Sequence, residues 1–341
     1  METKRIIFPE VNRAELATEN WETKGDDYVI VKTEISTISA GTERANITGD
    51  PNVNGRNAPS VRFPRKPGYS SAGTVMEVGP AVTKVKPGDR VVVVWGAHSQ
   101  YNVVNESKVV KIEEDSVTFA QAAMVLISTF SMAAVRKCRF EIGEAAMVMG
   151  LGILGQFAIR ILHAAGAAPL IAVDPVASRR EEALKGGADY ALDPFEEGFA
   201  DRVKALTGGK GVPVCIEVTG QGTAFDQALD CMAQFGRIAL LGCTRNKEFS
   251  IDYYRKIHCP GITVIGAHTM ARPKQESAPG WFTEVDDMRA VMRLVACGRL
   301  KLDNMESEMH APEECAEVYQ RLINDRNFPP IVQFDWNRLE K

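Results

Sequence analysis

Along the first third of the chain, apolar and polar residues alternate in short runs that glycine and proline interrupt. Residues 28–35 and 73–78 follow this two-residue period and are rich in β-branched side chains, and residues 90–94 form a valine run. Pro87, Gly88 and Asp89 supply a turn before that run. Short strands separated by turn residues predict a compact β-barrel or a folded β-domain.

The pattern changes near residue 120, where the Ala-rich segment 118–137 has the period of a helix and is followed by alternating strands and helices. This alternation predicts a parallel sheet that helices cover on both faces. The predicted strands are 145–149, 169–173, 214–218, 236–241 and 262–265, and the predicted helices are 155–165, 178–185, 223–232, 286–296 and 312–323.

The two patterns predict two domains, as does the length of 341 residues. A last strand-like segment, 330–334, is expected to return to the first domain. The first domain would then comprise residues 1–121 and 299–341, with a dinucleotide-binding domain inserted at residues 122–298. The predicted fold class is therefore α/β, a β-rich domain with a doubly wound parallel sheet.

A glycine-rich segment follows the first strand of the predicted parallel sheet. It has the form GxGxxG and comprises Gly150, Leu151, Gly152, Ile153, Leu154 and Gly155. The first glycine allows a tight turn, the second lets a pyrophosphate approach the backbone, and the third lets the helix pack close to the strand. The N-terminus of the following helix offers free N–H groups to phosphates. The segment predicts a nicotinamide dinucleotide site.

The next predicted strand ends at Asp174, which lies 24 residues after Gly150. A carboxylate at this place accepts hydrogen bonds from the ribose diol of the adenosine and favours NAD. Arg179 and Arg180 leave NADP open, because either guanidinium could meet a 2′-phosphate. Solvated charges at a helix start are the alternative for both arginines.

Composition and charge exclude several classes of protein. The formal net charge of −4 argues against nucleic acid as a partner, since its binding proteins present a basic face. No run reaches the roughly 18 apolar residues of a membrane span, and the N-terminus lacks a signal peptide's apolar core. The seven cysteines are widely spaced and contain no CxxC pair, which predicts a cytoplasmic protein without disulfides.

Several segments together resemble the medium-chain dehydrogenase/reductase superfamily, the alcohol dehydrogenase-like group. They lie in the family's order over almost the whole chain: 38–43 (ISAGTE), 67–79 (PGYS with Gly73 and EVG), 85–91 (VKPGDRV), 217–220 (EVTG) and 240–242 (LLG). The resemblance implies a GroES-like catalytic domain, a Rossmann cofactor domain and an active site between them. It also implies a homodimer or homotetramer.

The chain departs from the zinc-containing members of this family. The positions of the three zinc ligands hold Ala40, Tyr69 and a residue at or near Val125, and Ser70 replaces the glutamate that follows the histidine. No cysteine precedes Cys138, so the four-cysteine structural zinc site is missing as well. Because zinc sites need Cys, His or carboxylate ligands, we expect neither zinc.

Without zinc, a positioned acid must polarise and protonate the carbonyl oxygen. Tyr69 replaces the zinc histidine and is a candidate proton donor, with a simple pocket wall as the alternative. Thr42 stands at the family's hydroxyl relay position, and Glu43 is either a base or a structural carboxylate. His268, after strand 262–265, is the best histidine candidate, and His98 is expected to line the substrate pocket.

The resemblance also implies cofactor contacts from Thr129 on helix 118–137 and from Thr219 and Gly242 in the later segments. An aromatic pocket of Trp95, Tyr101 and Trp281 is an alternative to ordinary core packing of these side chains.

These features lead to three functional hypotheses. The first is a zinc-independent NAD(P)-dependent oxidoreductase that moves a hydride between nicotinamide and a secondary alcohol or ketone of the polyol, sugar or cyclitol type. The second is a reductase of activated C=C bonds, as in quinone or enoyl reductases, whose chemistry needs mainly oxyanion stabilisation. The third is a non-catalytic NAD(P)-binding protein. A small molecule is the expected substrate in the first two.

Overall fold

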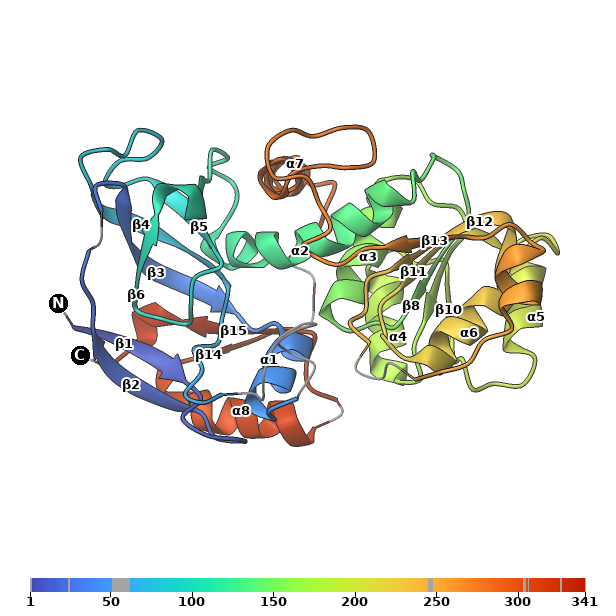
Figure 1. The fold of residues 1–341 in the computed structure, drawn as a ribbon, viewed down its shortest axis with the longest axis horizontal. Coiled ribbons are helices and arrows are strands. Elements are labelled where there is room, and N and C mark those ends of the chain that lie inside the picture. The colour runs from blue at the N-terminus through green and yellow to red at the C-terminus, as the bar shows by residue number, and fades with distance from the viewer. Residues whose placement is uncertain are drawn as a thin grey trace. The chain divides into compact units, whose positions relative to one another are not determined.

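The computed structural model describes residues 2–23, 25–50, 62–244, 248–302, 305, 307–325 and 327–340. The chain divides into two compact units, one of Met1–Leu126 with Glu306–Lys341 and one of Ile127–Met305 (Figure 1). The sequence pattern places these boundaries after residues 121 and 298. In the structure, the first boundary lies after Leu126, inside helix α2 (Phe119–Lys137).

The first unit is built on a seven-stranded sheet of order β14-β15-β3-β4-β5-β7, in which β6 also pairs with β3. Alternate valines of the predicted strands form an apolar cluster with Val85, namely Val29, Val31, Val75, Val91 and Val93. The strands are β3 (Tyr28–Thr37), β4 (Ser70–Val78), β5 (Arg90–Val94), β6 (Tyr101–Asn105), β7 (Val109–Lys111), β14 (Ser307–His310) and β15 (Ile331–Asp335), beside a hairpin of β1 (Glu2–Ile7) and β2 (Glu15–Asn20).

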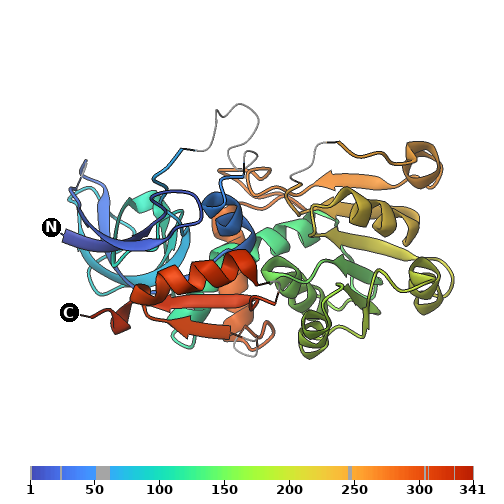
Figure 2. The ribbon, with the colours of Figure 1, turned by 90° about the horizontal axis from the view of Figure 1, so that it is seen from below.

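The C-terminal strand returns to the first unit, as predicted. Strand β15 pairs antiparallel with β3, with Phe334 opposite Ser36. Helix α8 (Cys315–Asn324) packs beside it and buries Tyr319 in a second apolar cluster. Figure 2 shows α8 running alongside β14 and β15.

Helix α1 (Ala40–Ile47) was not predicted, because its sequence AGTERANI has no apolar stripe of helical period. It buries Ala45, Ile47 and the carboxylate of Glu43 instead. Tertiary packing, rather than intrinsic propensity, therefore stabilises this short helix.

The second unit contains a six-stranded parallel sheet of order β10-β9-β8-β11-β12-β13. The order reverses between β8 and β11, and doubly wound sheets bind dinucleotides at such a switch point. The strands are β8 (Ala146–Met149), β9 (Leu170–Val173), β10 (Tyr190–Leu192), β11 (Val212–Glu217), β12 (Met232–Leu240) and β13 (Thr263–Gly266).

Helices flank this sheet on both sides, as the strand–helix alternation predicts (Figure 1). Helices α3 (Ile153–Ala164) and α4 (Ala177–Lys185) pack on one face, and α5 (Phe199–Leu206) and α6 (Gly222–Asp230) pack on the other. The remaining helices are α7 (Glu284–Ala296), a π-helical turn η2 (Tyr254–His258) and the 3₁₀ turns η1 (Glu106–Lys108), η3 (Pro312–Glu314) and η4 (Trp336–Arg338).

Helix α2 is long and apolar enough, by length and composition alone, to cross a membrane. Most of its apolar window, 78%, is buried inside the protein. A core helix meets the same criteria, and this degree of burial is what such a helix shows.

Candidate active site

The glycine-rich loop joins β8 to α3 and has the geometry that its sequence predicts. Gly150 has a φ of +97°, a conformation that side chains disfavour. A Cβ on Gly155 would clash with the carbonyl oxygen of Gly150, so the third glycine permits close packing of helix and strand. A Cβ on Gly152 would meet no atom within 4 Å. The loop is therefore open at its second glycine, beside the N–H groups of Ile153 and Leu154, and fits a pyrophosphate there.

Asp174 follows β9 and is almost fully buried. Its Oδ2 accepts a hydrogen bond from the N–H of Leu151 (2.8 Å), and its Oδ1 accepts one from the N–H of Val176 (2.9 Å). Each carboxylate oxygen keeps one further lone pair. The carboxylate thus braces the glycine-rich loop and retains the capacity to accept from ribose hydroxyls.

The two arginines of α4 differ in their contacts. Arg179 Nη1 lies 3.8 Å from Oδ2 of Asp174. Arg180 Nη1 donates to the carbonyl oxygen of Asp174 (2.7 Å) and pairs with Asp193 (3.2 Å). Arg180 is therefore a structural clamp between α4 and β9, and Arg179 is the arginine beside the predicted ribose site.

Thr219 and Gly242 lie at the ends of neighbouring strands. A Cβ on Gly150 would lie 2.8 Å from Cγ2 of Thr219, and a Cβ on Gly242 would clash with the N–H of Gly220. The Glu217 carboxylate accepts hydrogen bonds from the N–H (2.7 Å) and the hydroxyl of Thr219. Burial raises the pKa of Glu217. The structure thus brings Gly150, Thr219 and Gly242 to the same edge of the sheet, at the switch point.

Tyr69, just before β4, is held by two partners. Its hydroxyl donates a hydrogen bond to Oγ of Ser39, at 2.6 Å. Its ring stacks on the indole of Trp95, with centroids 5.0 Å apart and planes inclined by 26°. Trp95 has a left-handed φ of +56°, which is uncommon for a bulky residue and recurs at binding sites. The phenol and the partly exposed indole therefore form one oriented aromatic pair.

The burial and contacts of Glu43 are those expected of a structural carboxylate, and its role as a base stays a prediction. Glu43 is 1% exposed. Its Oε1 accepts from the N–H of Ser39 (2.8 Å), and its Oε2 accepts from the hydroxyl of Tyr319 (2.5 Å) and contacts Nε2 of His98 (3.1 Å).

His98 was expected to line the substrate pocket, and this prediction is wrong. Its ring is fully buried. Nδ1 lies 2.7 Å from Oγ of Ser36, and Nε2 lies 3.1 Å from Oε2 of Glu43. The Glu43 carboxylate and the hydroxyl of Ser36 occupy both ring nitrogens. The imidazole therefore cross-links α1 to the sheet.

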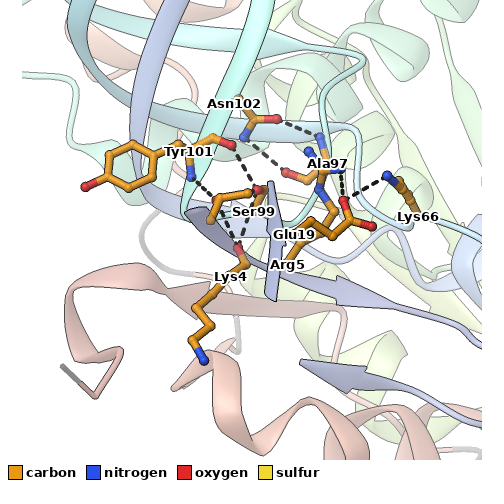
Figure 3. Close-up of polar contacts among 9 residues, drawn as sticks. Lys4, Arg5, Glu19, Lys66, Ala97, Ser99, Tyr101 and Asn102 are labelled. Carbon is orange, nitrogen blue, oxygen red and sulfur yellow. Dashed lines mark hydrogen bonds and ion pairs between the residues drawn. The ribbon is translucent and has the colours of Figure 1, made fainter. Parts of the chain in front are cut away.

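The turn between β5 and β6, which carries His98, is held by its own side chains (Figure 3). Oδ1 of Asn102 accepts from the N–H of Ala97 (3.0 Å), and its Nδ2 donates to the carbonyl oxygen of the same residue (3.2 Å). The hydroxyl of Ser99 donates to the carbonyl oxygen of Tyr101 (2.9 Å). These bonds stabilise the turn on both sides of His98 in the sequence.

Three further predicted site residues lie on α1, after β13 and in α2. Thr42 is exposed on α1. His268 is exposed after β13, where its Nδ1 accepts from the N–H of Met270 (3.2 Å). Thr129 is fully buried in α2, and its carbonyl oxygen accepts from Arg272 (3.2 Å). Catalytic roles for Thr42 and His268, and a cofactor contact from Thr129, stay predictions.

Sequence reasoning missed Ser39 and Gln156. Ser39 stands next to the lost cysteine position, and only the fold shows that it contacts both Tyr69 and Glu43. Gln156 directly follows the third glycine of the loop, and its place there is the only signal that the sequence offers.

Two family models match the chain. The alcohol dehydrogenase GroES-like domain matches residues 25–114, and the zinc-binding dehydrogenase domain matches residues 154–284. L-threonine 3-dehydrogenase of Pyrococcus abyssi is 33% identical over 271 residues, which cover 71% of this chain and 74% of that protein. This chain belongs to the medium-chain dehydrogenase/reductase superfamily. It is accordingly an NAD(P)-dependent oxidoreductase of CH–OH groups.

Other members of this superfamily agree with the fold. D-guloside 3-dehydrogenase of Escherichia coli K12 is 30% identical over 217 residues, 63% of this chain and 61% of that protein. Benzyl alcohol dehydrogenase of Acinetobacter calcoaceticus superposes with a TM-score of 0.83 at 19% identity. A putative zinc-binding dehydrogenase of Sinorhizobium meliloti bound to NADP has a TM-score of 0.79 at 19% identity. Each of the two alignments covers 98% of this chain and 99% of the other protein's chain. The similarity therefore extends over both domains.

One of the two matching family models is described as a zinc-binding dehydrogenase. The residues at the expected ligand positions of this chain do not fit a catalytic zinc ion. Among the ligand positions that the family resemblance implies, Ala40 has no donor atom, and Val125, at or near the third position, is a buried apolar side chain. The hydroxyl of Ser70 donates to a backbone carbonyl oxygen (2.6 Å), and that of Tyr69 donates to Ser39. In the described part of the chain, no group of three or more His, Cys, Asp or Glu side chains could hold a metal ion.

Proposed function

We propose that the protein is an NAD-preferring, zinc-independent dehydrogenase that interconverts a secondary alcohol of the polyol, sugar or cyclitol type and its ketone. The hydrogen bond of Tyr69 to Ser39 carries this proposal. It supports an oriented hydroxyl at the sequence position to which the family resemblance assigns a zinc ligand.

The proton would move through the Tyr69 phenol. When NAD is bound, its nicotinamide supplies the hydride acceptor for alcohol oxidation. In that direction the phenolate form of Tyr69, which has released its own proton to solvent, takes the hydroxyl proton of the alcohol and becomes the phenol. In reduction the phenol gives this proton to the carbonyl oxygen and becomes the phenolate. The Ser39 hydroxyl, 2.6 Å away, can rotate to donate to the phenol oxygen when that oxygen has lost its proton. Tyr69 and Ser39 thus supply without metal the proton transfer that the reaction needs.

The preference for NAD rests on Asp174. Its buried carboxylate would accept from the ribose diol and repel a 2′-phosphate. Arg179 lies 3.8 Å from this carboxylate, so its guanidinium is oriented toward Asp174. The glycine-rich loop, with its open second glycine, would hold the pyrophosphate.

The indole of Trp95 supports a ring-shaped, hydroxylated substrate. Its ring is partly exposed beside the Tyr69 phenol. The C–H face of a sugar or cyclitol would pack on such an apolar surface while its hydroxyl groups reach polar partners. A relative is named for activity on D-guloside, which also favours this class.

A substrate panel tests the proposal. Polyols, glycosides and cyclitols are assayed with NAD⁺ and NADP⁺, and quinones and enones with the reduced cofactors, each with and without a chelator. We expect NAD-dependent turnover of a hydroxylated ring compound that the chelator does not reduce, and zinc far below one ion per chain by elemental analysis. Turnover of quinones or enones alone would overturn the substrate class. A tightly bound zinc whose removal abolishes activity would overturn the metal-free mechanism.

A further inference from the structure

Gln156 is fully buried at the first turn of α3, and the fold uses its whole amide group. Its Nε2 donates to the carbonyl oxygen of Arg179 (2.9 Å) and to that of Leu151 (3.3 Å). Its Oε1 accepts from Nη1 of Arg160 (3.1 Å). One side chain therefore joins the glycine-rich loop to the first turn of α4.

A buried ion pair supports this amide. Arg160 and Glu182 are both nearly inaccessible, and Nη2 of the arginine lies 2.6 Å from the carboxylate. A Cβ on Gly186 would lie 2.6 Å from Nη1 of Arg160, so this glycine makes room for the guanidinium. Desolvation offsets much of the attraction in a buried ion pair, and apolar residues of similar volume often serve stability as well. Stability alone therefore gives a weak reason for this polar network.

The network controls the segment on which cofactor recognition depends. Asp174 binds the N–H of Leu151, and Gln156 binds its carbonyl oxygen, so both peptide groups of this loop residue are fixed. The same amide fixes the backbone of Arg179, whose guanidinium lies 3.8 Å from Asp174. The position of Arg179 relative to Asp174 thus depends on Gln156.

We infer that Gln156 is a positioning residue for discrimination between NAD and NADP. It holds the backbone of Arg179 so that the guanidinium stays on the Asp174 carboxylate instead of turning toward a 2′-phosphate. Release of this backbone frees the guanidinium to pair with the phosphate, and NADP gains affinity relative to NAD. The inference rests on the proposed NAD preference of the site.

Direct binding of NAD and NADP to the purified full-length protein tests the inference without a substrate. In Gln156→Leu, which keeps the side-chain volume and removes the amide, we expect the ratio of Kd for NADP to Kd for NAD to fall on the order of tenfold, about 1.4 kcal/mol. Glu182→Gln, at the far end of the network, should lower the ratio less. In Arg179→Ala, the Gln156→Leu substitution should leave the ratio unchanged, because the guanidinium that it releases is absent.

A matched control is Gln227→Leu on α6, whose amide also donates to a backbone carbonyl oxygen, that of Pro194 (3.1 Å). This variant should keep the wild-type ratio. If Gln156→Leu and Glu182→Gln lower thermal stability yet keep the ratio, the network is structural only and the inference is overturned. If Gln156→Leu fails to fold, the ratio in Glu182→Gln decides. A wild-type protein that binds NADP more tightly than NAD would refute the proposed NAD preference. The role of Gln156 would still be tested by the change in the Kd ratio between wild type and Gln156→Leu.

Discussion

The phenol oxygen of Tyr69 lies 2.6 Å from Oγ of Ser39, and the N–H of the same serine donates to the buried carboxylate of Glu43. Ser39 therefore links the hydroxyl of the half-buried Tyr69 to the buried carboxylate of Glu43. The proposed function assigns proton transfer to the phenol of Tyr69, and these contacts favour a supporting role for the carboxylate of Glu43.

Tyr69→Phe should lower kcat and kcat/KM together by about 10²–10⁴-fold, because the ring remains and only the proton-transfer group is lost. The Kd for NAD should change little. Steady-state kinetics and cofactor titration measure both. Tyr28→Phe is the matched control, since that hydroxyl bonds Glu77 on the surface of the same unit. Undiminished turnover in Tyr69→Phe would reduce Tyr69 to a pocket wall and leave Thr42 and His268 as candidates.

Two alanine substitutions in the glycine-rich loop should have opposite consequences. Gly152 has an ordinary φ of −68° and open space around a Cβ, so Gly152→Ala should change stability by less than about 0.5 kcal/mol. It should weaken NAD binding at least about tenfold, because the methyl group would fill the pyrophosphate site. Gly155→Ala should lower stability by about 1–3 kcal/mol through its clash with Gly150. Unfolding curves and NAD titrations of both variants check this contrast, and unchanged NAD affinity in Gly152→Ala would remove the pyrophosphate from this loop.

Glu43→Ala should lower the free energy of unfolding by about 3 kcal/mol or more. The substitution leaves His98, Tyr319 and the N–H of Ser39 without their buried acceptor, at about 1–3 kcal/mol for each unsatisfied group. Tyr319→Phe removes one donor of the same network and should lower the free energy of unfolding by less than Glu43→Ala does. Urea unfolding of the two variants measures these differences. A stable Glu43→Ala protein without turnover would restore the carboxylate as a catalytic base.

The carboxyl group of Asp287 should make stability fall between about pH 4 and pH 6. Burial raises the pKa of Asp287 from 3.8 to about 6, although Arg136 lies 2.8 Å and Arg272 3.6 Å from its oxygens. In this window the native state binds more protons than the unfolded state, so the free energy of unfolding falls as pH rises. The fall should be on the order of 3 kcal/mol. It should be absent from Asp287→Asn in urea unfolding at pH 4–7.

Asp286 is the neighbouring control for this pH dependence. Hydrogen bonds from Ser277 and Thr283 lower the pKa of Asp286, so its stabilisation is present above the ordinary carboxyl pKa and is lost as pH falls. Asp286→Asn should therefore change the pH profile in the opposite sense to Asp287→Asn. Identical profiles for wild type and Asp287→Asn would contradict the raised pKa.

Local sequence determined the features that depend on neighbouring residues. The strand–helix alternation after residue 120 predicted the parallel sheet, because periodicity follows from which faces of each element are buried. The GxGxxG spacing predicted the open second glycine and the tightly packed third, because both are requirements of a short backbone segment. The geometry of the glycine-rich loop could therefore be predicted from the sequence.

The tertiary structure alone decided the partners of the candidate side chains. Glu43 contacts Tyr319 from 276 residues away and His98 from 55 residues away, and these contacts favour a structural role for its carboxylate. The amide of Gln156 reaches Arg179 only because α3 and α4 pack on the same face of the sheet. Local periodicity carries no information about such pairs, since the packing of distant segments sets which polar groups must satisfy each other once both lose contact with water.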